Sequence, residues 1–204
     1  MWPTAHKLLL ERRLRKIYGQ IRGSVLVVGA GLEPYRELLK SADQVVATDI
    51  GEGHGGLDCV ADAHSLPFRS ESFDFVLAIE VFEHLRAPAR AALEISRVLK
   101  PNGGAIVTIP FMFRVHGDPN DFQRLTSRGI EAMFGDLFSI DVQPFGGRIH
   151  VISDVVSTAW KPLVILRGIN WLLSAPLLDR ASADCPSGYC VSAIKTSCVR
   201  GRKE

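Results

Sequence analysis

The stretch that most constrains the fold is VLVVGAG, residues 25–31, in which an apolar run leads directly into a turn with two glycines. An apolar run that ends in glycine is typical of a strand buried on both faces of a parallel sheet. Gly29 and Gly31 accept backbone angles that other residues resist, and they let a ligand approach the main chain. Open α/β sheets bind ligands at the carboxyl ends of their strands, so this turn is a candidate binding site.

The chain continues with short apolar segments that alternate with helical ones. Strands are expected at 24–29, 44–49, 57–61, 73–79 and 103–110, and helices at 33–41, 87–99 and 126–134. Such alternation predicts a parallel sheet covered by helices on both faces. Two late strands, 138–146 and 188–196, lack the regular strand–helix rhythm between them and predict an antiparallel hairpin at the sheet edge. We therefore predict an α/β, doubly wound, seven-stranded sheet that is mostly parallel.

Length and composition indicate an ordinary globular protein. A chain of 204 residues with 47% hydrophobic and 23% charged side chains most simply forms one domain, residues 1–204. The net charge of +2 and the lack of a broad basic strip argue against a nucleic-acid partner. The four cysteines lack zinc-type spacing and are interpreted as reduced thiols, with a Cys185–Cys190 disulfide as the alternative under oxidation. The sequence shows no secretory signal and no spanning segment, which predicts a cytoplasmic protein.

Two segments lie outside the alternating pattern. Residues 1–22 hold an amphipathic helix, which we expect to dock on the domain, with a membrane-surface helix as the alternative. Residues 149–178 form an apolar helical insertion that contains Trp160 and Trp171 among basic residues. Core packing or a homodimer face is the first interpretation of this insertion. The alternative is a lid or a peripheral element at the inner face of the membrane, serving a lipid-linked acceptor.

Asp49 ends the second expected strand, 20 positions after Gly29. A carboxylate at this place can accept hydrogen bonds from both hydroxyls of a ribose, although a surface aspartate at a strand end is the alternative. Pro34 stands where a dinucleotide fingerprint has its third glycine, and it weakens the cluster of N–H groups that would hold a pyrophosphate. The turn and the acid together favour an adenosine ligand without a pyrophosphate.

The segment DCVADAHSLPF, residues 58–68, follows the third expected strand. The Asp62 carboxylate can accept a hydrogen bond from the exocyclic amine of adenine, and the Ala63 N–H can bind a ring nitrogen. A loop aspartate that caps a short helix is the alternative interpretation of Asp62.

The most specific signals are FDFVLAIEVFEHL, residues 73–85, and RVLKPNGGAIVTIP, residues 97–110. Together with the opening turn, they resemble the class I S-adenosylmethionine-dependent methyltransferases, in particular the methyltransferase type 11 or ubiquinone-menaquinone methyltransferase-like family. The resemblance runs from Val25 to about Pro110, with a final strand near 188–196. It implies a Rossmann-like fold, S-adenosyl-L-methionine as the cofactor and methyl transfer as the activity.

The resemblance also assigns cofactor-binding roles by position. The implied cofactor-binding residues are Gly29, Ala30, Gly31, Asp49, Ile50, Asp62, Ala63, Ile79, Glu80 and His84. The glycine turn approaches the methionine and the ribose, Glu80 meets the methionine end, and His84 lies over the reaction side. The family often has an acid where this chain has Val27 and a glycine where it has Glu33. Loss of the acid removes a partner for the cofactor's amino group. Glu33 or Glu80 can take the place of that partner.

A candidate acceptor site follows the fifth expected strand, in FMFRVHGDPNDFQRLT, residues 111–126. The candidate catalytic residues are His116, Asp118, Asp121 and Arg124. The segment is similar to the H-x-x-P-x-D-[FY]-x-R-[YFL]-T stretch of a bacterial branch of the family that often serves envelope-glycan or lipid-linked pathways. His116 is the natural general base at neutral pH, with an aspartate to orient it and Arg124 to bind an anionic group. The structural alternative is an Asp121–Arg124 pair that locks the loop.

These observations predict a methyltransferase that acts on a small-molecule or lipid- or glycan-linked acceptor. The alternative is a catalytically silent, cofactor-binding protein that acts as a partner subunit. No metal site is expected, because the histidines show no convincing ligand pattern. The histidines are His6, His54, His64, His84, His116 and His150.

Overall fold

The computed structural model describes residues 3–31, 35–51, 56–116, 120–159, 168–173, 175 and 181–196, without the side chains of Tyr35 and Arg36. The helices are α1 (Ala5–Tyr18), α2 (Tyr35–Leu38), α3 (Pro88–Val98), α4 (Ser127–Phe134), α5 (Arg148–Ala159) and α6 (Gly168–Leu173), with a 3-10 helix η1 (Phe82–His84). The strands are β1 (Ser24–Val28), β2 (Gln44–Asp49), β3 (Cys59–Val60), β4 (Phe73–Ile79), β5 (Leu99–Pro110), β6 (Phe138–Phe145) and β7 (Gly188–Lys195).

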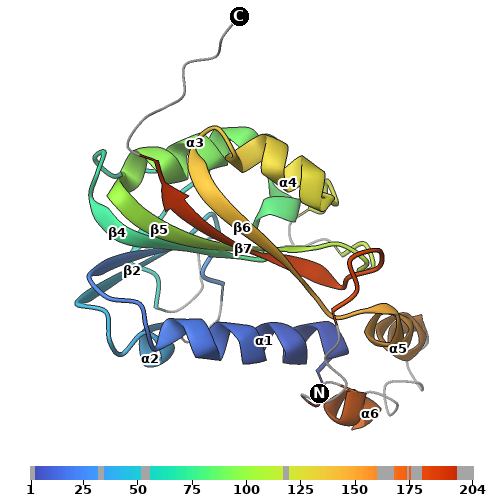
Figure 1. Cartoon of the computed structure of the whole chain (residues 1–204). Coiled ribbons are helices and arrows are strands. Elements are labelled where there is room, and N and C mark those ends of the chain that lie inside the picture. The colour runs from blue at the N-terminus through green and yellow to red at the C-terminus, as the bar shows by residue number, and fades with distance from the viewer. Residues whose placement is uncertain are drawn as a thin grey trace, which may run out of the picture.

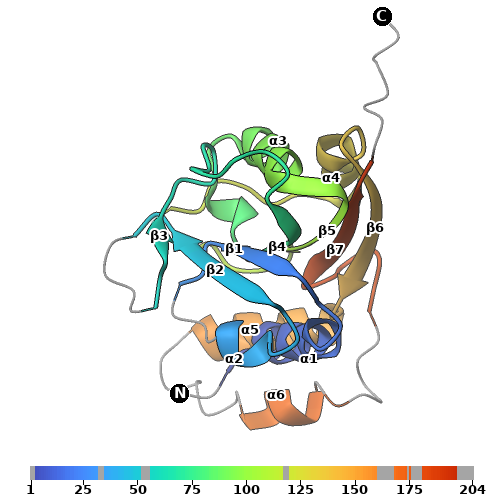
Figure 2. The ribbon, with the colours of Figure 1, turned by 90° about the vertical axis from the view of Figure 1, so that its left-hand side faces the viewer.

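The seven strands form one sheet in the order β3-β2-β1-β4-β5-β7-β6 (Figure 2). β3, β2, β1, β4 and β5 are parallel, whereas β7 pairs antiparallel with both β5 and β6. The predicted fold class is therefore confirmed, with β6 as the edge strand and β7 inserted beside β5. The strand order changes direction between β1 and β4, which is the switch point where open α/β sheets bind ligands.

Helices cover both faces of the sheet (Figure 1). Alternate residues of β1 point to opposite faces, so Leu26 and Val28 pack with α3 and α4, while Val25 and Val27 pack with α1. The side chains of all four are at least 97% buried, as expected for a central parallel strand.

The N-terminal amphipathic helix docks on the sheet as α1. The Thr4 hydroxyl caps it by accepting a hydrogen bond from Lys7 N at 3.2 Å. Leu9, Leu14 and Tyr18 lie in the core on the α1 side of the sheet. The apolar face therefore packs against protein, which agrees with the docked interpretation of this segment.

The apolar insertion forms α5 and α6, which pack beside the start of α1 (Figure 1). The buried Asp154 carboxylate of α5 accepts hydrogen bonds from Ala5 N at 2.7 Å and His6 N at 2.9 Å. It thereby satisfies two backbone donors that the first turn of α1 leaves open. Trp160 lies outside the described residues. Among those residues, no helix combines the length and the apolar character needed to cross a membrane.

Element boundaries differ from the prediction mainly around β5, which begins at Leu99 rather than 103. Phe73 pairs with Leu99 and Phe75 pairs with Gly104, so the register shifts by a bulge. Asn102 turns the chain there with a φ of 62°. The sequence missed this start because residues 100–103 have the composition of a turn, although the pairs with β4 on either side of them keep the segment within β5.

Candidate cofactor and acceptor site

A cavity of about 870 Å³ lies at the carboxyl ends of β1, β2 and β4. This volume is within the range of small-molecule sites. The predicted cofactor residues that line it are Gly29, Gly31, Asp49, Ile50, Asp62, Ala63, Glu80 and His84. Arg86, Arg90, Asn120 and Phe122 also line it, and the sequence did not single them out.

The glycine turn forms one wall of this cavity. Gly29 has a φ of 66°, and a Cβ atom added to it would lie 2.5 Å from the Val81 side chain. Gly31 has a φ of 54°, and an added Cβ atom would meet no other described residue within 4 Å. Gly29 is therefore required by both backbone angle and packing, whereas Gly31 keeps open space beside the cavity.

Asp49 joins two turns at the end of β2. Its Oδ2 accepts a hydrogen bond from Gly31 N at 2.8 Å, and its Oδ1 accepts one from Gly51 N at 3.2 Å. A carboxylate oxygen accepts more than one hydrogen bond, so Asp49 can still receive ribose hydroxyls. The next residue, Ile50, is 59% exposed and lines the cavity, where it offers an apolar surface to a ring.

The loop after β3 holds Asp62 in a tight turn. Asp62 Oδ1 accepts a hydrogen bond from His64 N at 2.8 Å and lies 2.6 Å from His64 Nδ1. The His64 N–H bond is the main cause that lowers the pKa of Asp62, so this group is ionised at neutral pH. Asp62 and its neighbour Ala63 both line the cavity wall.

Ala30 and Ile79 do not line the cavity and lie behind it. Ala30 is buried, and its N–H donates to the Thr48 carbonyl at 2.9 Å. Ile79 packs against the core on the α1 side of the sheet. Ala30 therefore supports the glycine turn, and Ile79 supports the end of β4.

Glu80 reaches the cavity from a strained position with a φ of 55°. Its Oε2 lies 2.9 Å from Nε2 of the buried His6 in α1. Its Oε1 is buried and has no hydrogen-bond partner among the described residues. One oxygen is therefore fixed by α1, and the other is left without a hydrogen-bond partner among the described residues.

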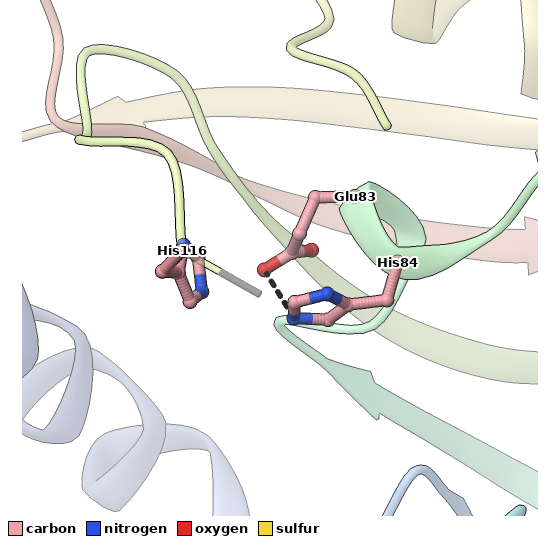
Figure 3. Close-up of side chains that lie close together, drawn as sticks. All are labelled: Glu83, His84 and His116. Atoms are coloured by element: carbon pink, nitrogen blue, oxygen red, sulfur yellow. Dashed lines mark ion pairs between the residues drawn. The ribbon is translucent and has the colours of Figure 1, made fainter. Parts of the chain in front are cut away.

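Glu83, His84 and His116 lie close together beside the cavity (Figure 3), and His84 is the one of the three that lines it. His84 Nε2 lies 3.6 Å from Glu83 Oε1, and the His84 and His116 ring centroids are 5.2 Å apart. Glu83 is fully buried, and burial together with the nearby Glu80 charge raises its pKa to about 9. Burial also lowers the pKa of His116, which favours a neutral imidazole.

Asp121 and Arg124 form the pair that the structural alternative expected. Arg124 donates to both oxygens of Asp121, and this pairing lowers the pKa of Asp121 to about 2. Asp121 Oδ2 also accepts a hydrogen bond from His116 N at 2.9 Å, and the Thr126 hydroxyl caps α4. The pair therefore fixes the backbone of His116. Four residues named in the sequence analysis lie outside the described residues, namely Glu33, Pro34, His54 and Asp118.

Sequence reasoning missed two residues of this site, His6 and Glu83. His6 lies in a helix predicted only for docking, and it reaches Glu80 across 74 positions of chain. Glu83 stands inside the quoted EVFEHL segment, where the adjacent acid and histidine gave a signal that was not used.

Comparison with known families and structures places this geometry in context. Residues 26–107 match the family model described as a methyltransferase domain. The comparison with curated proteins gives no match.

Solved structures share the whole architecture at low sequence identity. A SAM-dependent methyltransferase from Archaeoglobus fulgidus has a TM-score of 0.63 at 20% identity, over 93% of this chain and 94% of that chain. A possible histamine N-methyltransferase from Thermotoga maritima has a TM-score of 0.63 at 16% identity, over 94% and 92%. A chain from a complex with the Haloferax volcanii Trm112 methyltransferase activator has 0.64 at 15%, over 95% and 93%. At these identities the likeness shows the shared fold.

Proposed function

We propose that the cavity binds S-adenosyl-L-methionine and presents its methyl group to an acceptor, because residues 26–107 match the family model of a methyltransferase domain. The observation that carries the proposal is the position of the cavity. It lies at the switch point of the sheet, and its wall contains a glycine turn and the carboxylates of Asp49 and Glu80.

The cofactor would lie along the cavity with its adenosine at the β2 and β3 end. Asp49 would receive the ribose hydroxyls, and Asp62 with Ala63 would meet the adenine edge between the exposed Ile50 and the loop. The methionine would lie beside the Gly29–Gly31 turn. This orientation directs the sulfonium methyl toward His84.

Glu80 is the proposed partner of the cofactor's amino group. Its buried Oε1 lacks a hydrogen-bond partner among the described residues, and an ammonium would supply one. His6 fixes the other oxygen at 2.9 Å, so the carboxylate is oriented before the cofactor binds. Glu80 would thereby replace the acid that the family often carries at the position of Val27.

The reaction needs alignment, exclusion of water and removal of one proton. The carbon–sulfur bond of the sulfonium breaks as the acceptor's oxygen or nitrogen forms its bond to the methyl carbon, and the sulfur leaves as a neutral thioether. The acceptor's proton would be lost beside His84, which lines the cavity and whose ring centroid lies 5.2 Å from that of His116. The neutral imidazole of His116, positioned through Asp121, is the proposed base there.

The proposed acceptor is a small molecule or a lipid- or glycan-linked group. The helices α5 and α6 expose an apolar set of side chains that would serve a peripheral membrane contact or a homodimer face. These are Ile149, Ile152, Val155, Val156, Ile169, Trp171 and Leu172. The alternative is a silent partner subunit. It is suggested by the similar chain from the Haloferax volcanii complex, which contains a methyltransferase activator. It predicts cofactor binding without turnover.

Isothermal titration with S-adenosylmethionine and S-adenosylhomocysteine tests the cofactor proposal directly. We expect both to bind with one molecule per chain, and we expect Asp49→Asn to weaken both. Asp141→Asn, on the exposed edge strand β6, is the matched control and should bind as the unaltered protein does. Failure of the unaltered protein to bind either compound would overturn the proposed function.

A further inference from the structure

We propose that Glu83, His84 and His116 hold a divalent transition-metal cation at the acceptor end of the cavity. The residue spacing in the sequence had predicted no metal site, and the folded arrangement now argues for one (Figure 3). Binding of the ion follows from these side chains alone. Its catalytic role, given below, rests on the proposed methyl transfer.

The distances suit a single ion. One ligand atom from each of the three side chains lies within 4.8 Å of the others, and His84 Nε2 is 3.6 Å from Glu83 Oε1. Tetrahedral zinc with bonds of about 2.0–2.1 Å separates its ligand atoms by roughly 3.4 Å. The Glu83–His84 pair already has nearly this separation, so mainly the His116 side would move inward.

The histidines are oriented as metal ligands commonly are. His84 Nδ1 donates to the Asn120 carbonyl, which leaves the lone pair on Nε2, the nitrogen that faces Glu83. His116 Nδ1 lies 3.3 Å from the Arg114 carbonyl and 3.2 Å from Asp121 Oδ2, so Nε2 is the nitrogen proposed to bind the ion. Such outer hydrogen bonds fix the tautomer and the ring direction of metal-binding histidines.

Glu83 gives the independent sign of a missing ligand. Its side chain is fully buried, and neither carboxyl oxygen has a hydrogen-bond partner among the described residues. Buried carboxyl groups are rarely left in this condition, because losing water without gaining a partner is costly. A cation between Glu83 and the two imidazoles would satisfy this group.

The donor set selects the class of ion and leaves a place for the acceptor. Two imidazoles with one carboxylate suit Zn²⁺ or a similar transition-metal ion better than Mg²⁺, which prefers oxygen ligands. Three protein ligands leave a fourth position, and His84 lines the cavity. An acceptor hydroxyl bound there would lose its proton to solvent more readily and attack the methyl carbon as an alkoxide. His116 would then act as a ligand, which replaces its role as a free base.

Titration of metal-free protein with Zn²⁺ in a calorimeter, and with Co²⁺ in a visible-absorption experiment, tests the site. We expect one ion per chain, with Zn²⁺ bound at least about tenfold more tightly than Mg²⁺. His84→Ala, His116→Ala and Glu83→Gln should each weaken Zn²⁺ binding by at least about tenfold. The matched control is His64→Ala, which removes another cavity histidine outside the cluster and should bind Zn²⁺ normally.

The outcomes separate this proposal from the proposed function. Equal Zn²⁺ binding in the cluster variants and in the unaltered protein would overturn the metal site, as would a preference for Mg²⁺. Thermal unfolding in EDTA shows whether each variant folds. Glu83→Gln keeps the side-chain volume, so it still tests the site if an alanine variant fails to fold. Calorimetry of the metal-free protein with S-adenosylhomocysteine measures the cofactor site alone. Zn²⁺ binding without cofactor binding would remove the proposed methyl transfer and leave the metal site standing.

Discussion

Replacing Gly29 with alanine should destabilise the fold by about 2–5 kcal/mol, from two separable causes. The backbone of Gly29 has a φ of 66°, a conformation that costs a residue with a Cβ atom roughly 1–2 kcal/mol. The new Cβ atom would also lie 2.5 Å from Val81 Cγ2, and overpacking of this kind costs about 1–3 kcal/mol. Val81 is 91% buried and has little room to move away.

Gly31→Ala is the matched control because it carries only the first cost. Gly31 has a φ of 54°, but its new Cβ atom would meet none of the other residues that the structure describes within 4 Å, so we expect a loss of about 1–2 kcal/mol. Urea unfolding without cofactor measures both variants, and the difference between them isolates the Val81 contact. Equal losses in the two variants would refute this reasoning. Because Gly31 lines the cavity, its methyl group should weaken cofactor binding even though the fold is kept.

Three further variants test other parts of the site. Asp49→Asn should weaken S-adenosylmethionine binding by about 10- to 100-fold in calorimetry, since it weakens charge-assisted hydrogen bonds worth about 1.5–3 kcal/mol. Asp154→Ala should lower the free energy of unfolding by about 2–3 kcal/mol in urea, because two buried N–H groups at the start of α1 lose their acceptor. Arg97 lowers the pKa of Glu94 below its ordinary 4.5, so the stability that this pair adds is complete above pH 4.5 and is lost as the pH falls through the lowered value. The unfolding difference between Glu94→Gln and the unaltered protein should therefore shrink from pH 7 to pH 3.

The parallel part of the fold could be predicted because its information is local. β1, β2 and β4 are apolar runs with glycine or acid at their carboxyl ends, and this pattern fixes which strand ends meet at the ligand edge. Gly31 and Asp49 were predicted to share a site, and they are joined by a hydrogen bond of 2.8 Å. The boundaries of β5 were predicted less well, because the bulge depends on its neighbour in the sheet.

The remaining features depend on contacts between distant segments. No pattern in the sequence indicated that His6 would orient Glu80, because the two residues are 74 positions apart and meet only in the folded protein. The Glu83, His84 and His116 cluster combines loops that follow β4 and β5. Their spacing in the sequence matches no metal motif, yet neighbouring parallel strands bring the two loops to the same edge. The spacing of residues in the sequence therefore predicts a site formed by one loop better than a site formed by two loops.

The insertion and the cavity are connected through α1. Asp154 of α5 holds the backbone of His6 at 2.9 Å, and the His6 ring holds Glu80 Oε2 at 2.9 Å. His6 Nδ1 also lies 3.3 Å from the Ser187 hydroxyl, which ties the ring to the segment before β7. The insertion is therefore joined to the cavity wall through three side chains, those of Asp154, His6 and Glu80.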